Sequence, residues 1–147
     1  MQKILMTLGI LIYALLIPIL EISPSHVFNS NWPAHALLHE VWQLMSNSMM
    51  GVYCLWLIWK EGKIFAPSLI SLIVMGGFLM AYALRNLYGG SMVHSDGSEI
   101  AVTILNMGAL NLGVFIGILV CILFSVTLLK SKNNYGPSAG SIVPNSP

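Results

Sequence analysis

The sequence predicts an all-α integral membrane protein, a bundle of four transmembrane helices, from its composition and the spacing of its charges. Hydrophobic residues make up 56 % of the 147 positions and charged residues only 7 %, whereas a soluble domain carries about 25 % charged residues. Four long stretches contain no Asp, Glu, Lys or Arg, and each is of the order of the roughly 20 residues with which a helix crosses a bilayer core, the last one being the longest. Since backbone groups in lipid must be hydrogen-bonded within the protein, these stretches predict a helical bundle.

The four spans belong to one domain, residues 1–132. We expect them near residues 4–22, 34–59, 64–85 and 100–129. The first span resembles a signal peptide, because Lys3 precedes its apolar run. That run is longer than the about 7–15 residues of such a segment and contains Pro18, so we expect a retained helix. Residues 133–147 are rich in Asn, Ser, Gly and Pro, which predicts a disordered tail.

The second helix is expected to start at Asn31-Trp32-Pro33, since Asn caps free N–H groups and Pro is tolerated in a first helical turn. Continued to Trp59, this helix would be about 40 Å long at 1.5 Å per residue. Its first two turns would then stand above the hydrocarbon core, at the level of the lipid headgroups.

Lysines mark one face of the predicted bundle: Lys3, Lys60, Lys63, Lys130 and Lys132. The positive-inside rule makes that face cytoplasmic, which predicts a cell-membrane protein with both termini in the cytoplasm. All four histidines then lie on the opposite face, where Arg85 is the one strong base. Tryptophans are expected in interfacial belts, with Trp56 and Trp59 inside and Trp32 and Trp42 outside.

Polar residues share one face of the second helix. His35 and His39 are four positions apart and stack on that face, which continues to Gln43 and Ser46. On the predicted fourth helix, Glu99, Thr103 and Asn106 form a matching stripe. Because intramembrane polar groups usually face the bundle interior or a wet cavity, the two stripes predict an outward-opening cleft between helices two and four. Its mouth would hold Glu21, His26, His94 and Asp96, and its third wall Arg85 and Asn86.

Two kinds of chemistry fit such a cleft. His35 and His39 have the spacing of metal ligands, and His26, His94, Glu40 or Glu21 would complete a mononuclear set. The order is H-x-x-x-H-E, unlike the H-E-x-x-H of zinc proteases, and four histidines are too few for a di-iron desaturase. The second kind of chemistry is general acid–base catalysis on a lipid-like substrate, in which a carboxylate such as Glu40 or Glu99 orients or tunes a histidine.

Non-catalytic interpretations stay open beside these. The histidines and tryptophans also suit interfacial anchors in a structural or assembly subunit. A small four-helix transporter has a similar length but carries an acidic residue deep in its first helix, whereas Glu21 is at the helix end. Haem needs histidines on facing helices, and His35 and His39 share one helix, so no cofactor is assigned.

The net charge and the spacing of small residues indicate which partners the protein binds. A net charge of +1 argues against nucleic acid, which leaves the bilayer and a lipid-like small molecule. Gly113 and Gly117 form a G-x-x-x-G on the fourth helix, a seam for close helix contact or for a homo-oligomer. Cys54 and Cys121 lie in apolar runs and are expected to be packing residues.

The stretch HVFNSNWPAHALLHEVW, residues 26–42, resembles the signature H-x-F-x-x-x-W-P-x-H-A-x-x-H-x-x-W of a group of small four-span membrane proteins of unknown function. The matching positions are His26, Phe28, Trp32, Pro33, His35, Ala36, His39 and Trp42. The group is similar in layout to DoxX-like four-helix membrane proteins. This resemblance implies a fold and an important region but no activity.

The candidate site residues are therefore as follows. Catalytic candidates are His35, His39 and Glu99. Binding candidates are His26, Trp32, Gln43, Arg85, Asn86 and Asn106. Metal-ligand candidates are His35, His39 and His26.

Overall fold

The computed structural model describes residues 1–93, 97, 99, 101–103 and 108–134. A first helical segment consists of α1 (Gln2–Leu11), a π-helical turn η1 (Ile12–Leu16) and α2 (Ile17–Glu21). It is followed by α3 (Ala34–Trp59), α4 (Phe65–Tyr88), a hairpin of β1 (Ala101–Thr103) and β2 (Ala109–Asn111), and α5 (Leu112–Asn134). The prediction of a helical protein is confirmed. Among the described residues, three helices are long and apolar enough to cross a membrane: Gln2–Glu21, Phe65–Tyr88 and Leu112–Ser131.

The helix α3 has the length of a span but not the apolar character of the other three. It lies where residues 34–59 predict it, yet it carries Gln43, Ser46, Asn47 and Ser48 in its middle. Its start also differs from the expectation, because the residue that precedes the helix is Pro33, whose side chain has no hydrogen-bonding group with which to cap it. The side chain of Asn31 therefore does not cap α3.

The last helix begins at Leu112 rather than near residue 100. Residues 101–103 pair with residues 109–111 in an antiparallel hairpin, with Val102 opposite Leu110. Val102 and Thr103 are β-branched and suit strands, and Gly108 adopts a φ of 94° that favours glycine. The Asn111 side-chain oxygen then accepts the Gly113 backbone N–H at 2.9 Å, which caps the start of α5.

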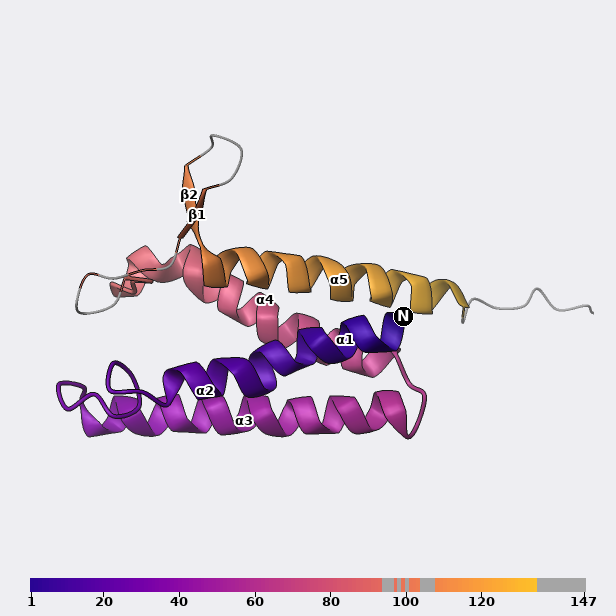
Figure 1. Ribbon diagram of the computed structural model, residues 1–147, viewed down its shortest axis with the longest axis horizontal. Coiled ribbons are helices and arrows are strands. Elements are labelled where there is room, and N and C mark those ends of the chain that lie inside the picture. Colours follow the sequence, from indigo (N-terminus) through magenta and orange to yellow (C-terminus); the bar gives the residue numbers. More distant parts are fainter. Residues whose placement is uncertain (94–96, 98, 100, 104–107, 135–147) are drawn as a thin grey trace, which may run out of the picture.

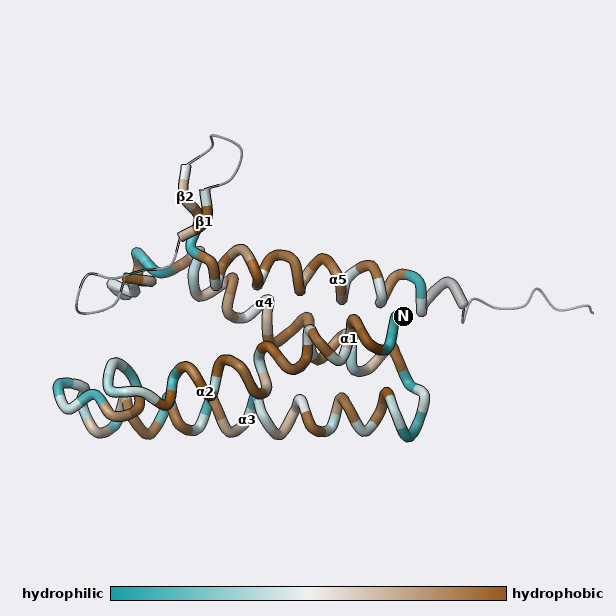
Figure 2. Tube along the Cα trace, viewed as in Figure 1, coloured by the Kyte–Doolittle hydropathy of each residue, from teal (hydrophilic) through white to brown (hydrophobic). Residues whose placement is uncertain are grey.

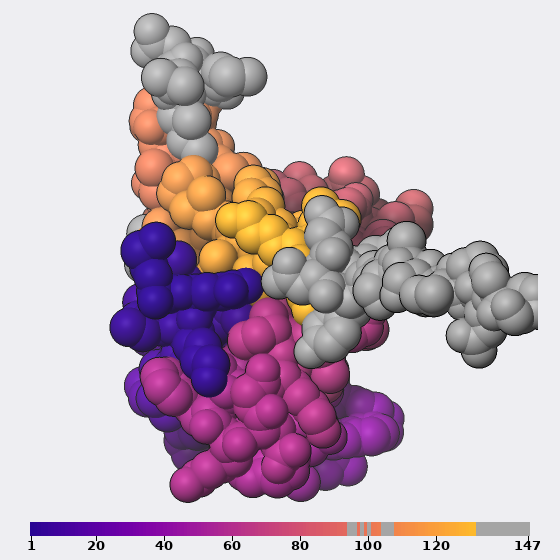
Figure 3. Space-filling view, turned by 90° about the vertical axis from the view of Figure 1, so that its right-hand side faces the viewer, coloured from indigo at the N-terminus to yellow at the C-terminus, as the bar shows by residue number. Residues whose placement is uncertain are grey.

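The four helical segments lie side by side along one direction (Figure 1). The helix α5 packs mainly along α4, whereas α3 packs against the first segment and α4. The connections that follow α2 and α4 lie at one end of the molecule, and the N-terminus, the connection after α3 and the end of α5 gather at the other (Figures 1 and 3). The lysine-bearing segments thus share one end, as the charge pattern predicts.

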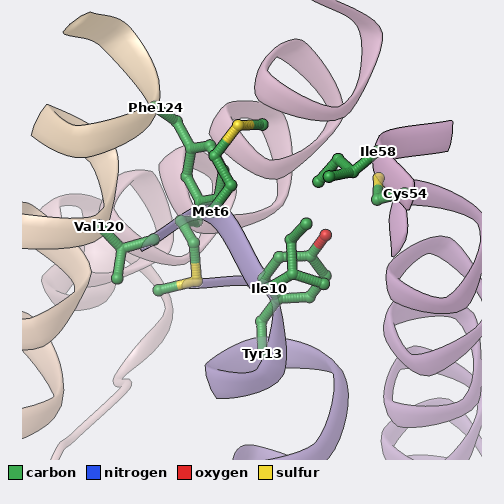
Figure 4. Close-up of a cluster of buried hydrophobic side chains, with 8 residues drawn as sticks. Met6, Ile10, Tyr13, Cys54, Ile58, Val120 and Phe124 are labelled. Carbon is green, nitrogen blue, oxygen red and sulfur yellow. The ribbon is translucent and has the colours of Figure 1, made fainter. Parts of the chain in front are cut away.

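The core lies between the segments and draws on all four of them. Its buried side chains are Met6, Ile10, Tyr13, Cys54, Ile58, Met75, Val120 and Phe124 (Figure 4). Gly9 lets the Phe124 ring come close, since a Cβ at position 9 would lie 3.0 Å from that ring. The helices are hydrophobic along most of their length (Figure 2), and many of their leucines and isoleucines are exposed, as expected of helices that face lipid.

The π-helical turn in the first segment has an identifiable cause. Pro18 has no N–H with which to bond the Ala14 carbonyl one turn before it. The Ser48 hydroxyl of α3 donates to this carbonyl instead, at 2.8 Å. Gly51 of α3 lies directly against Ala14, because a Cβ at position 51 would come within 2.2 Å of the Ala14 Cβ. The widened turn is therefore held by its packing on α3.

Candidate functional site

Most of the predicted site residues that the structure describes fall into two regions at the same end of the molecule, not into one cleft. The helix α3 contacts the first segment and α4, while α5 lies along α4 (Figure 1). The expected cleft between α3 and α5 therefore does not form. Of the residues expected on its fourth-helix wall, the two that the structure describes are not on α5, because Thr103 is in β1 and Glu99 precedes the hairpin.

The first region contains a histidine pair on the opening turns of α3. The Nε2 atoms of His35 and His39 lie 3.0 Å apart, and the two rings stand nearly perpendicular, at 87°. One ring donates its Nε2 proton and the other accepts it, so the two side chains adopt complementary tautomers. The Trp42 ring stacks on His39, with a centroid distance of 5.8 Å. The pair is thus held in one geometry by neighbours on its own helix.

The polar stripe that begins with this pair faces outward. His35, His39 and Gln43 are exposed, and Ser46 is half-buried. Gln43 is therefore part of an outer helix surface, where the sequence predicts a deep contact inside a cleft.

His26 lies in the connection between α2 and α3, among polar neighbours. Its Nε2 lies 3.1 Å from Glu21 Oε2, which forms an ion pair when the imidazole is protonated. Its Nδ1 lies 2.9 Å from Ser25 Oγ, and the Trp32 ring meets it edge-on with a centroid distance of 5.8 Å. Glu21, on which a transporter interpretation depends, is thus engaged at the end of the first segment.

Ser25, His26 and Glu21 have the order of a nucleophile, a base and an acid, which is a possible hydrolytic arrangement. The backbone N–H groups around them serve the loop instead. Those of His26 and Phe28 donate to the Ser23 carbonyl, and that of Val27 donates to the Glu21 carbonyl. An oxyanion needs preorganised donors aimed at it, so the geometry favours a structural role for these three residues.

Asn29 organises the same connection, and the sequence interpretation missed it. It is buried, with 8 % of its surface exposed. Its side chain donates to the Ser25 carbonyl at 3.0 Å and accepts the Asn31 N–H at 3.0 Å. An Asn in a turn-rich stretch often forms a hydrogen bond with the backbone two residues further along. This tendency could have indicated the role of Asn29 from the sequence.

The second region is a polar cavity at the end of α4. Its volume is about 250 Å³, and it is lined by Tyr82, Arg85, Gly90, Ser91, Met92, Val93, Glu99, Ala109 and Asn111. The Arg85 guanidinium lies 4.1 Å from the centre of the Tyr82 ring and donates to the Tyr82 carbonyl at 2.9 Å. Asn86 is exposed and does not line this cavity. Tyr82 and Asn111 were not predicted. Tyr82 is three residues before Arg85 on α4, and this helical spacing was the available signal. Asn111 is in β2, and only tertiary packing brings it to the cavity.

No metal site of three or more protein ligands exists in the described part of the chain, taking His, Cys, Asp and Glu together. His26 therefore does not join the pair of His35 and His39. His94, Asp96 and Asn106, which were also expected at the cleft, lie outside the described residues, as does the tail beyond Asn134.

The small residues of α5 are used within the chain. A Cβ at Gly117 would lie 3.2 Å from Phe78 and Leu79 of α4, and one at Gly113 would lie 3.9 Å from Phe78. This is the close helix contact that the G-x-x-x-G spacing predicts. Cys54 is buried and Cys121 half-buried, and both are free thiols.

Comparisons with family models, with curated proteins and with solved structures find no match to the chain. The resemblance to the small four-span group stays a prediction.

Proposed function

We propose that the chain is a four-helix integral membrane protein, with both termini cytoplasmic, that binds the polar head of a lipid-like molecule at its non-cytoplasmic end. Three apolar helices support the membrane location. The connection that carries Lys60 and Lys63 lies at the same end as the N-terminus (Figure 3), and the positive-inside rule favours this end as the cytoplasmic one. The polar cavity of Arg85 lies at the opposite end, where lipid headgroups would meet it.

The observation that carries the proposal is the cavity around Arg85. A guanidinium is the preferred side chain for two-point binding of a phosphate. Stacking on Tyr82 and the bond to its carbonyl hold this one in place before any ligand arrives. Glu99 lines the same cavity and adds a negative charge. A cavity with one positive and one negative side chain suits a zwitterionic lipid headgroup. Its phosphate would face Arg85, and its ammonium group would face Glu99.

The geometry favours binding over catalysis. Of the predicted catalytic residues, only Glu99 lines this cavity, while His35 and His39 are on the outer surface of α3. Acid–base catalysis requires the groups to reach one substrate within hydrogen-bond distance. We therefore propose a binding function for the cavity, without a reaction.

The test compares lipid retention by purified variants. Arg85→Gln keeps a polar side chain but removes the charge, and we expect it to retain about tenfold less phosphatidylethanolamine than the wild type. Arg85→Lys should retain an intermediate amount, since it keeps the charge but loses the planar fork. The matched control is Asn86→Gln, one residue along and outside the cavity. Equal phosphatidylethanolamine in all four proteins, measured by mass spectrometry of extracted lipid, would sink the proposal.

A second candidate is an assembly subunit, favoured by the outer face of α3. Seven of its exposed large apolar residues, all but Tyr53, repeat at alternating intervals of four and three: Leu38, Trp42, Met45, Met49, Val52, Trp56 and Trp59. This is the spacing with which two helices pack in a left-handed pair.

Self-association through Gly113 and Gly117 of α5 stays a prediction, although both glycines face α4. Blue native electrophoresis of Met49→Ala and Val52→Ala variants tests the α3 face: a partner packed there predicts a lower mass, and an unchanged mass argues against it.

A further inference from the structure

The pair of His35 and His39 is a separate feature from the Arg85 cavity, and the proposed function does not use it. Both side chains are exposed, and they project from successive turns of a 26-residue helix. Their relative position is therefore fixed by a rigid backbone. A rigid pair loses little conformational freedom when it binds a ligand, which favours binding over a comparable pair in a loop.

The separation of the two nitrogens has a definite meaning in coordination chemistry. Two nitrogens about 2.0–2.1 Å from one ion lie about 2.8–3.0 Å apart at a right angle and about 3.3–3.4 Å apart at the tetrahedral angle. The observed distance between the Nε2 atoms is 3.0 Å. It corresponds to neighbouring positions of a tetragonal or octahedral ion.

We propose that His35 and His39 form a two-imidazole site for a divalent transition-metal ion of tetragonal preference, with Cu(II) bound most tightly. Imidazole suits Cu, Ni and Zn, tetragonal nitrogen and oxygen sites favour Cu(II) or Ni(II), and affinity peaks at Cu(II) in the divalent series. Binding replaces the hydrogen bond between the rings. The ring that carries its proton on Nε2 shifts it to Nδ1, so both Nε2 lone pairs face the ion and both rings stay neutral.

The remaining coordination positions stay open to solvent or to an incoming ligand. In the described part of the chain no third His, Cys, Asp or Glu joins the pair. A site with two protein ligands exchanges its ion more readily than a closed structural site. It is therefore suited to an ion that is taken up and released.

Trp42 gives this site its own optical signal. Its ring stacks on His39 with an angle of 27° between the planes, and a bound Cu(II) quenches the fluorescence of a nearby indole. Titration of CuCl₂ into the full chain in detergent micelles should quench part of the emission at one ion per chain. The Trp42→Phe variant should lack the part of the emission that Cu(II) quenches. It should still bind Cu(II) with the wild-type affinity, as measured by calorimetry.

The decisive comparison moves the pair along the helix. His35→Gln and His39→Gln should each weaken Cu(II) binding by about 10- to 100-fold, whereas the matched control His26→Gln should leave it within about twofold. The double variant His35→Gln/Gln43→His recreates the four-residue spacing one turn later, with His39 as its first member, and should restore binding. Electron paramagnetic resonance should show two coordinated nitrogens in the wild type and in this variant.

Any one of three results with the variants would overturn the proposal. The first is a Cu(II) affinity that His35→Gln and His39→Gln leave unchanged. The second is a loss of Cu(II) affinity in His26→Gln as large as the loss in those two variants. The third is a double variant that unfolds at the wild-type temperature but does not regain Cu(II) binding. Zn(II) bound more tightly than Cu(II) would also contradict the assignment.

Discussion

Pro18 explains one of the hydrogen bonds that join the first segment to α3. Because Pro18 cannot donate to the Ala14 carbonyl, the Ser48 hydroxyl does so at 2.8 Å. A carbonyl without a partner is costly where no water can reach it. Ser48 is thus a structural residue in the part of α3 that is least apolar.

Ser48→Ala should lower the free energy of unfolding by about 1 kcal/mol, since it leaves the Ala14 carbonyl without that donor. The measurement is reversible unfolding in mixed micelles with increasing dodecyl sulfate. Ser46→Ala on the same helix is the control and should change the free energy by less than about 0.5 kcal/mol. Equal effects of the two substitutions would contradict the role given to Ser48.

Asn29→Ala should loosen the connection between α2 and α3. It removes one bond to the Ser25 carbonyl and one from the Asn31 N–H in a buried position, a loss of about 1–3 kcal/mol. We expect faster limited proteolysis between residues 22 and 33 than in the wild type. The control is Asn31→Ala, which keeps the backbone N–H and should be cut at the wild-type rate. Cleavage of Asn31→Ala as fast as that of Asn29→Ala would refute the role given to the Asn29 side chain.

Helix contacts depend on glycines in a position-specific way. A Cβ at Gly51 would come within 2.2 Å of the Ala14 Cβ, whereas one at Gly76 meets nothing within 4 Å. Gly51→Ala should therefore separate α3 from the first segment and destabilise the protein by about 1–3 kcal/mol. Gly76→Ala should leave stability unchanged or raise it, because alanine is the better helix former. Thermal unfolding in detergent compares the two, and equal melting temperatures would show that this contact is not tight.

The helices could be predicted from the sequence better than the hairpin could. Charges mark the ends of the apolar stretches, and the second and third helices start and end within about three residues of the expected positions. The run from residue 100 to residue 129 has no charge at which to divide it, so strands and helix were joined into one span. The division was present in weaker signals, the β-branched pair Val102–Thr103 and the turn-forming Gly108.

The lateral order of the segments could not be predicted. Hydropathy tells which residues enter the membrane, but it does not tell which helices are neighbours. The pair of His35 and His39 was predicted because helix geometry alone brings residues four apart together. The cavity of Arg85 and Glu99 depends on how α4, the hairpin and α5 meet, and the expected cleft failed for the same reason.

The positions of the polar residues along the molecule bear on its membrane topology. The connection with His26, the pair on α3 and the cavity of Arg85 all belong to the end opposite the N-terminus (Figure 1). They can serve one compartment only if α3 crosses the membrane. Because α3 is the least apolar of the four segments, its crossing is the step on which the proposed four-span topology depends.

Labelling of introduced cysteines from outside intact cells tests that crossing. Ser30→Cys, Glu61→Cys and Ser91→Cys report on the three connections, and the wild type, whose Cys54 is buried and Cys121 half-buried, serves as the blank. A membrane-impermeant maleimide should label Ser30→Cys and Ser91→Cys in intact cells and Glu61→Cys only after permeabilisation. Labelling of Ser30→Cys and Glu61→Cys together, with Ser91→Cys protected, would mean that α3 does not cross and would contradict the four-span bundle.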